Sequence, residues 1–145
     1  MRSPVRRRAD ARAGMFFYGT LLDPDIQRRV IGRALPARWF VPATLAGFRR
    51  VRVAGRWFPV LVPGLAHDRV AGGLALGLGA AERARILAYE GPLYSLVAVT
   101  VELADGRRKC ASVFLPRSGI MPTAEPWDLA RFQREDKPRV LRSGL

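Results

Sequence analysis

The chain has 145 residues, of which 49% are hydrophobic and 26% are charged. This length fits one compact domain, and the balance is typical of a globular protein, which excludes a wholly disordered chain or a fibre. No stretch approaches the ~20 apolar residues that a membrane-spanning helix needs, so we expect no membrane partner. The single cysteine, Cys110, and the single histidine, His67, exclude an internal disulfide framework and the usual Cys/His metal clusters.

The chain is strongly basic. Twenty-five lysine and arginine residues against 12 acidic residues give a formal net charge of +13, a surplus that would suit nucleic acid or an acidic surface as a partner. However, residues 1–13 hold a block of arginines, and the others are scattered along the chain. A basic block at a terminus is typically a solvated tail. We therefore expect residues 1–14 to form a disordered arginine-rich tail, residues 15–145 to form the domain, and nucleic acid not to be the partner.

The N-terminal segment does not have the pattern of a secretory signal. The apolar run that starts at Met15 breaks at Gly19-Thr20 and then reaches Asp23, so it is too short for the core of such a signal. Because the single thiol is also unpaired, we expect a cytoplasmic protein. A monomer is the default expectation.

The elements of the first half are predicted in chain order. Met15–Tyr18 is a short buried strand that ends at Gly19. Asp23 as N-cap and Pro24 at the first position begin a short helix that Gly32 ends. The rest reads as strands: Arg38–Val53, which Pro42 and Gly47 bend or divide into two, then Trp57–Val62 and Val70–Leu78.

The second half begins with a predicted helix over Ala80–Glu90, which Gly91-Pro92 ends. A hairpin of Tyr94–Leu103 and Cys110–Leu115 turns at Asp105-Gly106, and a last helix covers Pro126–Lys137. Six or seven short strands with two to three helices, not strictly alternating, predict an α+β domain built around a small curled sheet or barrel.

Glu90 is the candidate acid or base. It ends its helix on the face of Ile86 and Leu87. Burial there would raise the pKa of its carboxyl, and the partial negative charge of the helix C-terminus acts in the same direction. A carboxyl lifted toward neutrality can take and return a proton at working pH. The alternative is a Glu90 that turns outward or pairs with Arg83.

The second candidate is the loop Tyr18-Gly19-Thr20-Leu21, between the first strand and the first helix. Gly19 permits a backbone conformation closed to other residues, and successive free N–H groups there could bind an anion. Two weaker candidates have structural explanations. We expect His67 to be an exposed loop residue, because no nucleophile is near it in sequence, and Cys110 to be a small core residue.

Three motifs together resemble the γ-glutamylcyclotransferase-like family, also called avirulence-induced-gene-like. They are Tyr18-Gly19-Thr20-Leu21, Phe58-Pro59-Val60-Leu61-Val62-Pro63 and Tyr89-Glu90-Gly91-Pro92-Leu93-Tyr94. The resemblance extends from Met15 to about Leu115, and the order and approximate spacing of the motifs match.

The resemblance implies a small mixed β-barrel with flanking helices and one pocket. It implies that the backbone of the Tyr18–Leu21 loop holds a γ-glutamyl group, that Tyr94 helps to bind it, and that Glu90 is the general acid/base. The implied reaction releases an amine while the substrate's α-amino nitrogen closes onto the γ-carbonyl, which gives 5-oxoproline. Because the nucleophile is intramolecular, no metal, cofactor or catalytic triad is required.

The chain departs from the family pattern at two positions. Many members carry Asp where Leu87 stands and Arg where Leu96 stands. We predict that the two leucines contact each other as an apolar replacement for an ion pair. If the Asp and Arg of other members orient the substrate, their loss here could remove turnover. The alternative function is then a binding protein for a small metabolite on the same fold. A basic nucleic-acid-binding barrel is a third possible function.

Overall fold

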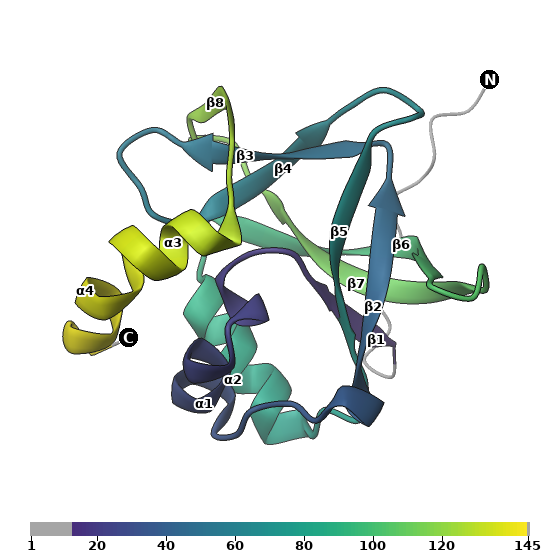
Figure 1. The fold of residues 1–145 in the computed structure, drawn as a ribbon, viewed down its shortest axis with the longest axis horizontal. Helices are drawn as coiled ribbons and strands as arrows, with labels where there is room; N and C mark the ends of the chain where they lie inside the picture. The colour runs from purple at the N-terminus through teal and green to yellow at the C-terminus, as the bar shows by residue number, and fades with distance from the viewer. Residues whose placement is uncertain (1–12, 145) are drawn as a thin grey trace.

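The computed structural model describes residues 13–144, and the predicted tail falls almost wholly outside this range (Figure 1). The first strand, β1 (Gly14–Phe17), begins one residue before the expected domain boundary. The remaining elements follow in chain order: η1 (Thr20–Leu22), α1 (Pro24–Ile31), η2 (Ala37–Trp39), β2 (Phe40–Ala46), β3 (Phe48–Val53), β4 (Pro59–Pro63), β5 (Arg69–Ala75), α2 (Ala80–Glu90), β6 (Tyr94–Leu103), β7 (Arg108–Pro116), β8 (Pro122–Pro126), α3 (Leu129–Glu135) and α4 (Lys137–Arg142).

The α+β fold contains a closed mixed barrel, as expected. Its strand order is β1-β5-β2-β6-β7, and a parallel pairing of β1 with β7 closes a ring whose other pairs are antiparallel. The other three strands form a separate sheet in the order β4-β3-β8. In Figure 1 the strands β3 and β4 run across the direction of β2 and β5, and α1 and α2 lie side by side. Within residues 13–144, no helix is long and apolar enough to cross a membrane.

Local sequence signals account for the helices beside the barrel. The carboxylate of Asp23 accepts hydrogen bonds from the N–H groups of Asp25 and Ile26, and Pro24 occupies the first turn of α1. Gly32 ends the helix at φ 97°, in the left-handed region that glycine adopts readily. Asp23 is fully buried, and Lys137 Nζ lies 2.8 Å from its Oδ2 atom, so the same residue ties α4 to the start of α1.

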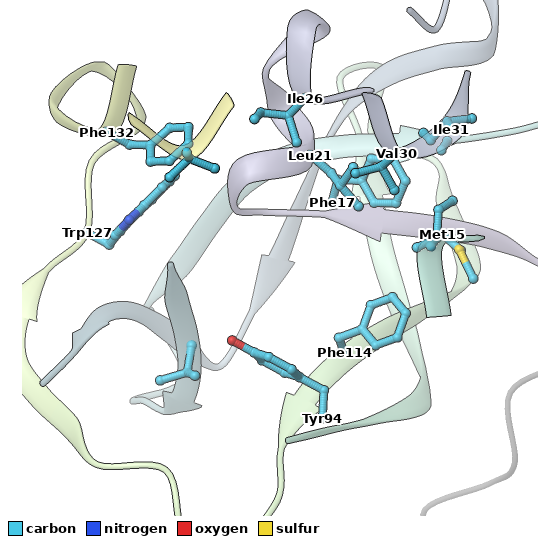
Figure 2. Packing of buried hydrophobic residues seen from close by; sticks show 14 of the residues in the cluster. Met15, Phe17, Leu21, Ile26, Val30, Ile31, Tyr94, Phe114, Trp127 and Phe132 are labelled. Carbon is cyan, nitrogen blue, oxygen red and sulfur yellow. The ribbon is translucent and has the colours of Figure 1, made fainter. Parts of the chain in front are cut away.

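Two clusters of buried hydrophobic side chains form the core. Successive β1 residues alternate between them: Phe16 belongs to one, and Met15 and Phe17 to the other. The cluster that contains Met15 and Phe17 is the larger one, and it extends to the C-terminal helices. Figure 2 shows the rings of Trp127 and Phe132 side by side in this cluster. This packing joins the barrel, the second sheet and all the α-helices into one body.

The structure differs from the sequence prediction in its smaller elements. The predicted strand region Arg38–Val53 divides into two strands at Gly47 (φ 84°), as expected, but the two strands, β2 and β3, enter different sheets. Strand β8 was not predicted, and the last helix begins later and is two helices, α3 and α4. Cys110 is exposed, so the prediction of a core position is wrong: the β7 residues that face inward start at Ala111. His67 is exposed in its loop, as expected.

Candidate active site

The loop after β1 approaches the second sheet closely at Gly19. A Cβ atom at this position would lie 2.9 Å from Cγ of Pro59, closer than real Cβ contacts. The Gly19 φ is −122°, outside the left-handed region that favours glycine, so the close approach to Pro59 is what requires glycine here. The contact with Pro59 joins two of the three motifs that carried the family resemblance.

Three N–H groups of this loop have no hydrogen-bond acceptor among the described residues. Leu22 N–H donates to the Gly19 carbonyl and Asp23 N–H to the Thr20 carbonyl, which makes the single turn of η1. Within residues 13–144, the N–H groups of Gly19, Thr20 and Leu21 donate to no protein acceptor. Free amides at the start of a helical turn attract negatively charged oxygens.

Glu90 is the last residue of α2, one turn after the fully buried Ile86. Its side chain keeps some contact with solvent, but protein atoms surround it on nearly all sides. This burial raises the pKa of the Glu90 carboxyl to about 7, and no basic side chain in the described part of the chain offsets the rise. The carboxyl can therefore both accept and donate a proton near neutral pH.

Glu90 lies where two hollows meet. The inner one is a cavity of about 30 Å³, roughly the space of one water molecule, lined by Phe16, Phe17, Tyr18, Gly19, Thr20, Leu21, Phe58, Pro59, Glu90, Tyr94 and Phe114. The outer one is an open cleft of about 340 Å³, lined by Thr20, Trp57, Phe58, Ala88, Tyr89, Glu90, Leu93 and Tyr94. Four residues line both hollows, so the two adjoin at Glu90: Thr20, Phe58, Glu90 and Tyr94.

Tyrosine side chains form the walls of the inner cavity. Tyr18 donates its hydroxyl to the Phe114 carbonyl at 2.6 Å, and Tyr94 donates to the Pro59 carbonyl at 2.9 Å. Figure 2 shows the Tyr94 ring beside that of Phe114. Burial, and secondarily the nearby Glu90, raises the pKa of both hydroxyls. Both tyrosines therefore stay neutral and hold the walls in place.

A hydrogen bond connects the two halves of the site. The Thr20 Oγ1 atom lies 2.7 Å from the Tyr89 hydroxyl, which joins the loop to the last turn of α2. Burial raises the pKa of Tyr89 as well, so this contact persists over the physiological pH range.

The structure brings together every residue that the sequence singled out for the site: Tyr18, Gly19, Thr20, Leu21, Glu90 and Tyr94. Tyr89, Phe58 and Pro59 also line it, although only their place in the resembling motifs pointed to them. Leu87 is 47% exposed and lines neither hollow, whereas Leu96 packs against the larger core cluster, and a contact between the two stays a prediction. Within residues 13–144, no group of three or more His, Cys, Asp or Glu side chains could hold a metal ion.

The fold and this site define a class of protein that a family comparison identifies. The family model described as gamma-glutamyl cyclotransferase, AIG2-like, matches residues 15–133, and the chain belongs to this family. It is 34% identical over 97 residues to AIG2-like protein A of Arabidopsis thaliana, which is 67% of this chain and 56% of that protein. AIG2-like protein B of the same plant is 35% identical over 95 residues, or 66% and 53% of the two chains. The chain thus spans little more than half the length of these relatives.

Solved structures show the same fold. The solution structure of one Arabidopsis thaliana protein is similar with a TM-score of 0.67 and 26% identity, over 90% of this chain and 87% of that one. A second solution structure from the same plant has a TM-score of 0.66 and 20% sequence identity, over 94% of this chain and 82% of that one. A structure titled gamma-glutamyl cyclotransferase has a TM-score of 0.56 and 17% sequence identity, over 76% of this chain and 69% of that one. This likeness is one of fold alone.

Proposed function

We propose that this chain is a γ-glutamylcyclotransferase-type enzyme. Its substrate would be a small γ-glutamyl amide, and its products 5-oxoproline and the free amine. The observation that carries this proposal is that Glu90, with the pKa of its carboxyl raised to about 7, lines the same cavity as Gly19, Thr20 and Leu21. Membership of the family supports the class of reaction.

The proposed reaction needs one proton carrier and no water. Glu90 takes a proton from the substrate's α-ammonium group, and the freed nitrogen attacks the γ-carbonyl carbon to close a five-membered ring. The C–N bond to the leaving amine then breaks as Glu90 returns the proton to that nitrogen. The ring nitrogen gives up its second proton through the same carboxylate, so the products are 5-oxoproline and the amine in its ammonium form. Because both reacting groups belong to one molecule, the protein contributes mainly by holding the folded conformer.

The loop supplies the complementary binding function in this proposal. The N–H groups of Gly19, Thr20 and Leu21 would bind negatively charged oxygens of the γ-glutamyl group. The inner cavity has room for a terminal oxygen beside Tyr18, so the carbon chain would lie in the larger cleft against Tyr94, which lines both hollows. The leaving amine would extend into the outer cleft. A cytoplasmic location is part of the proposal, because the single cysteine of the chain suits a reducing compartment.

The test is release of 5-oxoproline from a panel of γ-glutamyl amides, measured by mass spectrometry on the purified full chain. The panel includes amides of alkylamines and of amino acids. Glu90→Gln is the key variant because it keeps the shape of the side chain and removes the base. Glu102→Gln, at an exposed site on β6, is the matched control.

Turnover by the wild type and the control, with loss in Glu90→Gln, supports the proposal. Absence of turnover across the panel contradicts it. If calorimetry then detects tight binding of 5-oxoproline without any turnover, the chain is a metabolite-binding protein on this fold.

A further inference from the structure

Arg50 of β3 is a half-buried cation beside the Tyr18–Leu21 loop. Its Nη1 atom donates to the Tyr18 carbonyl at 2.8 Å and to the Ala71 carbonyl of β5 at 3.1 Å. Its guanidinium carbon lies 5.6 Å from the centre of the Trp127 ring, in the range of a cation–π contact. Arg50 thus connects the second sheet to the loop and to the barrel.

No carboxylate of residues 13–144 forms an ion pair with this guanidinium; Asp128 acts on it only from a longer distance. Its Nε atom is buried without a hydrogen-bond partner. A buried, unpaired cation is costly to a fold, so a fold that carries one gains when an anion binds nearby. Neighbouring Arg52 differs, because it is paired with Glu125 at 3.7 Å.

The bond to the Tyr18 carbonyl controls the direction of the next amide. The described chain contains no cis peptide, and in a planar trans peptide the C=O and N–H bonds point in opposite directions. Arg50 pulls the Tyr18 oxygen toward β3 and thereby turns the Gly19 N–H away from it. A carbonyl that accepts a charged hydrogen bond also makes the N–H of the same peptide a stronger donor.

We propose that Arg50 is a positioning residue for substrate binding: it orients and polarises the Tyr18–Gly19 peptide so that the Gly19 N–H binds a negatively charged oxygen of the ligand. This inference rests on the proposed function and adds a residue outside the three resembling motifs. Arg50 lines neither the inner cavity nor the cleft, so it acts through the loop and touches no reacting atom.

The experiment compares Arg50→Met and Arg50→Lys with Arg49→Met in the full chain. Arg49 is the adjacent, exposed residue of β3, and its replacement removes the same charge. The readouts are KM and kcat on the best γ-glutamyl amide of the panel, the Kd of 5-oxoproline by calorimetry, and the melting temperature. Because Arg50→Met and Arg49→Met lose the same charge, comparing the two at one ionic strength cancels the contribution of net charge.

We expect Arg50→Met to raise KM and the Kd of 5-oxoproline together by about tenfold, the size of one charge-assisted hydrogen bond, with kcat within about twofold. Arg50→Lys should recover part of the loss, because it keeps the charge and one donor. Arg49→Met should match the wild type. If Arg50→Met does not fold, the KM and the Kd of 5-oxoproline are compared between Arg50→Lys and the wild type instead, and a rise in both values in Arg50→Lys supports the inference.

Equal KM and Kd values in the Arg50 and Arg49 variants overturn the inference while the proposed function stands. An equal loss of kcat and stability without any change in Kd also overturns it, because that is the result of a structural role. A wild type that neither binds 5-oxoproline nor turns over any γ-glutamyl amide overturns the proposed function itself, and the role of Arg50 with it.

Discussion

The hydroxyl of Tyr89 lies 2.7 Å from Oγ1 of Thr20, a residue 69 positions earlier in the chain. It is a direct side-chain link between the loop that would bind the γ-glutamyl group and the helix turn that carries Glu90. Neither side chain is charged, so this hydrogen bond holds the two parts of the site together without adding a charge beside Glu90.

Removal of the Thr20–Tyr89 hydrogen bond should lower the stability of the protein. Thr20→Val and Tyr89→Phe should each lower the free energy of unfolding by about 1 kcal/mol, the net value of a typical hydrogen bond. The double variant should lose little more than either single variant, because both changes remove the same bond. Urea denaturation measures the three values, with the exposed Thr100→Val as the control. Fully additive losses would show that the contact contributes nothing.

Glu90 should make the stability of the protein fall as the pH rises. Its pKa in the folded state is about 7, above the ordinary value of 4.5, so the folded state holds the proton more tightly than the unfolded state. This contribution is fully present below pH 4.5 and is lost as the pH rises through 7. Relative to Glu90→Gln, the wild type should lose about 2–3 kcal/mol between pH 5 and pH 8. A constant difference between the two proteins across this range would contradict the burial of the carboxyl.

The same carboxyl should set the acid side of the activity profile. If Glu90 accepts the α-ammonium proton, kcat/KM should rise with pH and level off above an apparent pKa near 7, the value that burial gives the group. The measurement is initial 5-oxoproline release between pH 5 and pH 9. Glu102→Gln should leave the profile in place, whereas a profile that is flat from pH 5 to pH 7 would exclude Glu90 as the base.

Gly19→Ala should damage the loop through its contact with Pro59. The new Cβ would lie 2.9 Å from Cγ of Pro59, so the loop or β4 must move, at a cost of about 1–3 kcal/mol in the free energy of unfolding. Gly79→Ala is the control, because a Cβ there meets nothing closer than 3.7 Å. A second change, Pro59→Ala, should recover part of the loss in Gly19→Ala. Equal melting temperatures for the Gly19 and Gly79 variants would refute this explanation of the glycine.

The helices α1 and α2 and the main hairpin could be predicted because their signals are local. Asp23, Pro24 and Gly32 bound α1 as expected, and α2 and β6 cover the predicted Ala80–Glu90 and Tyr94–Leu103. Caps and turns depend on residues within a few positions of one another, so the sequence contains all that decides them.

The grouping of Tyr18–Leu21 with Glu90 was anticipated through the family resemblance, since no local pattern relates the two segments. Even the raised pKa of Glu90 depends on neighbours from distant elements, which supply the apolar walls around it. The helix pattern indicated only that Glu90 lies on the same face of the helix as Ile86.

The sequence by itself determined where α1 and α2 begin and end, the extent of β6, and that the chain has a single cysteine and a large positive charge. Only the tertiary structure decided that Arg38–Val53 serves two sheets, that β8 pairs with β3, and that Arg50 bonds to the Tyr18 carbonyl. The physical reason is that strand pairing and the partners of a buried arginine are set by contacts between residues far apart in the chain, whose energies no local sequence pattern contains.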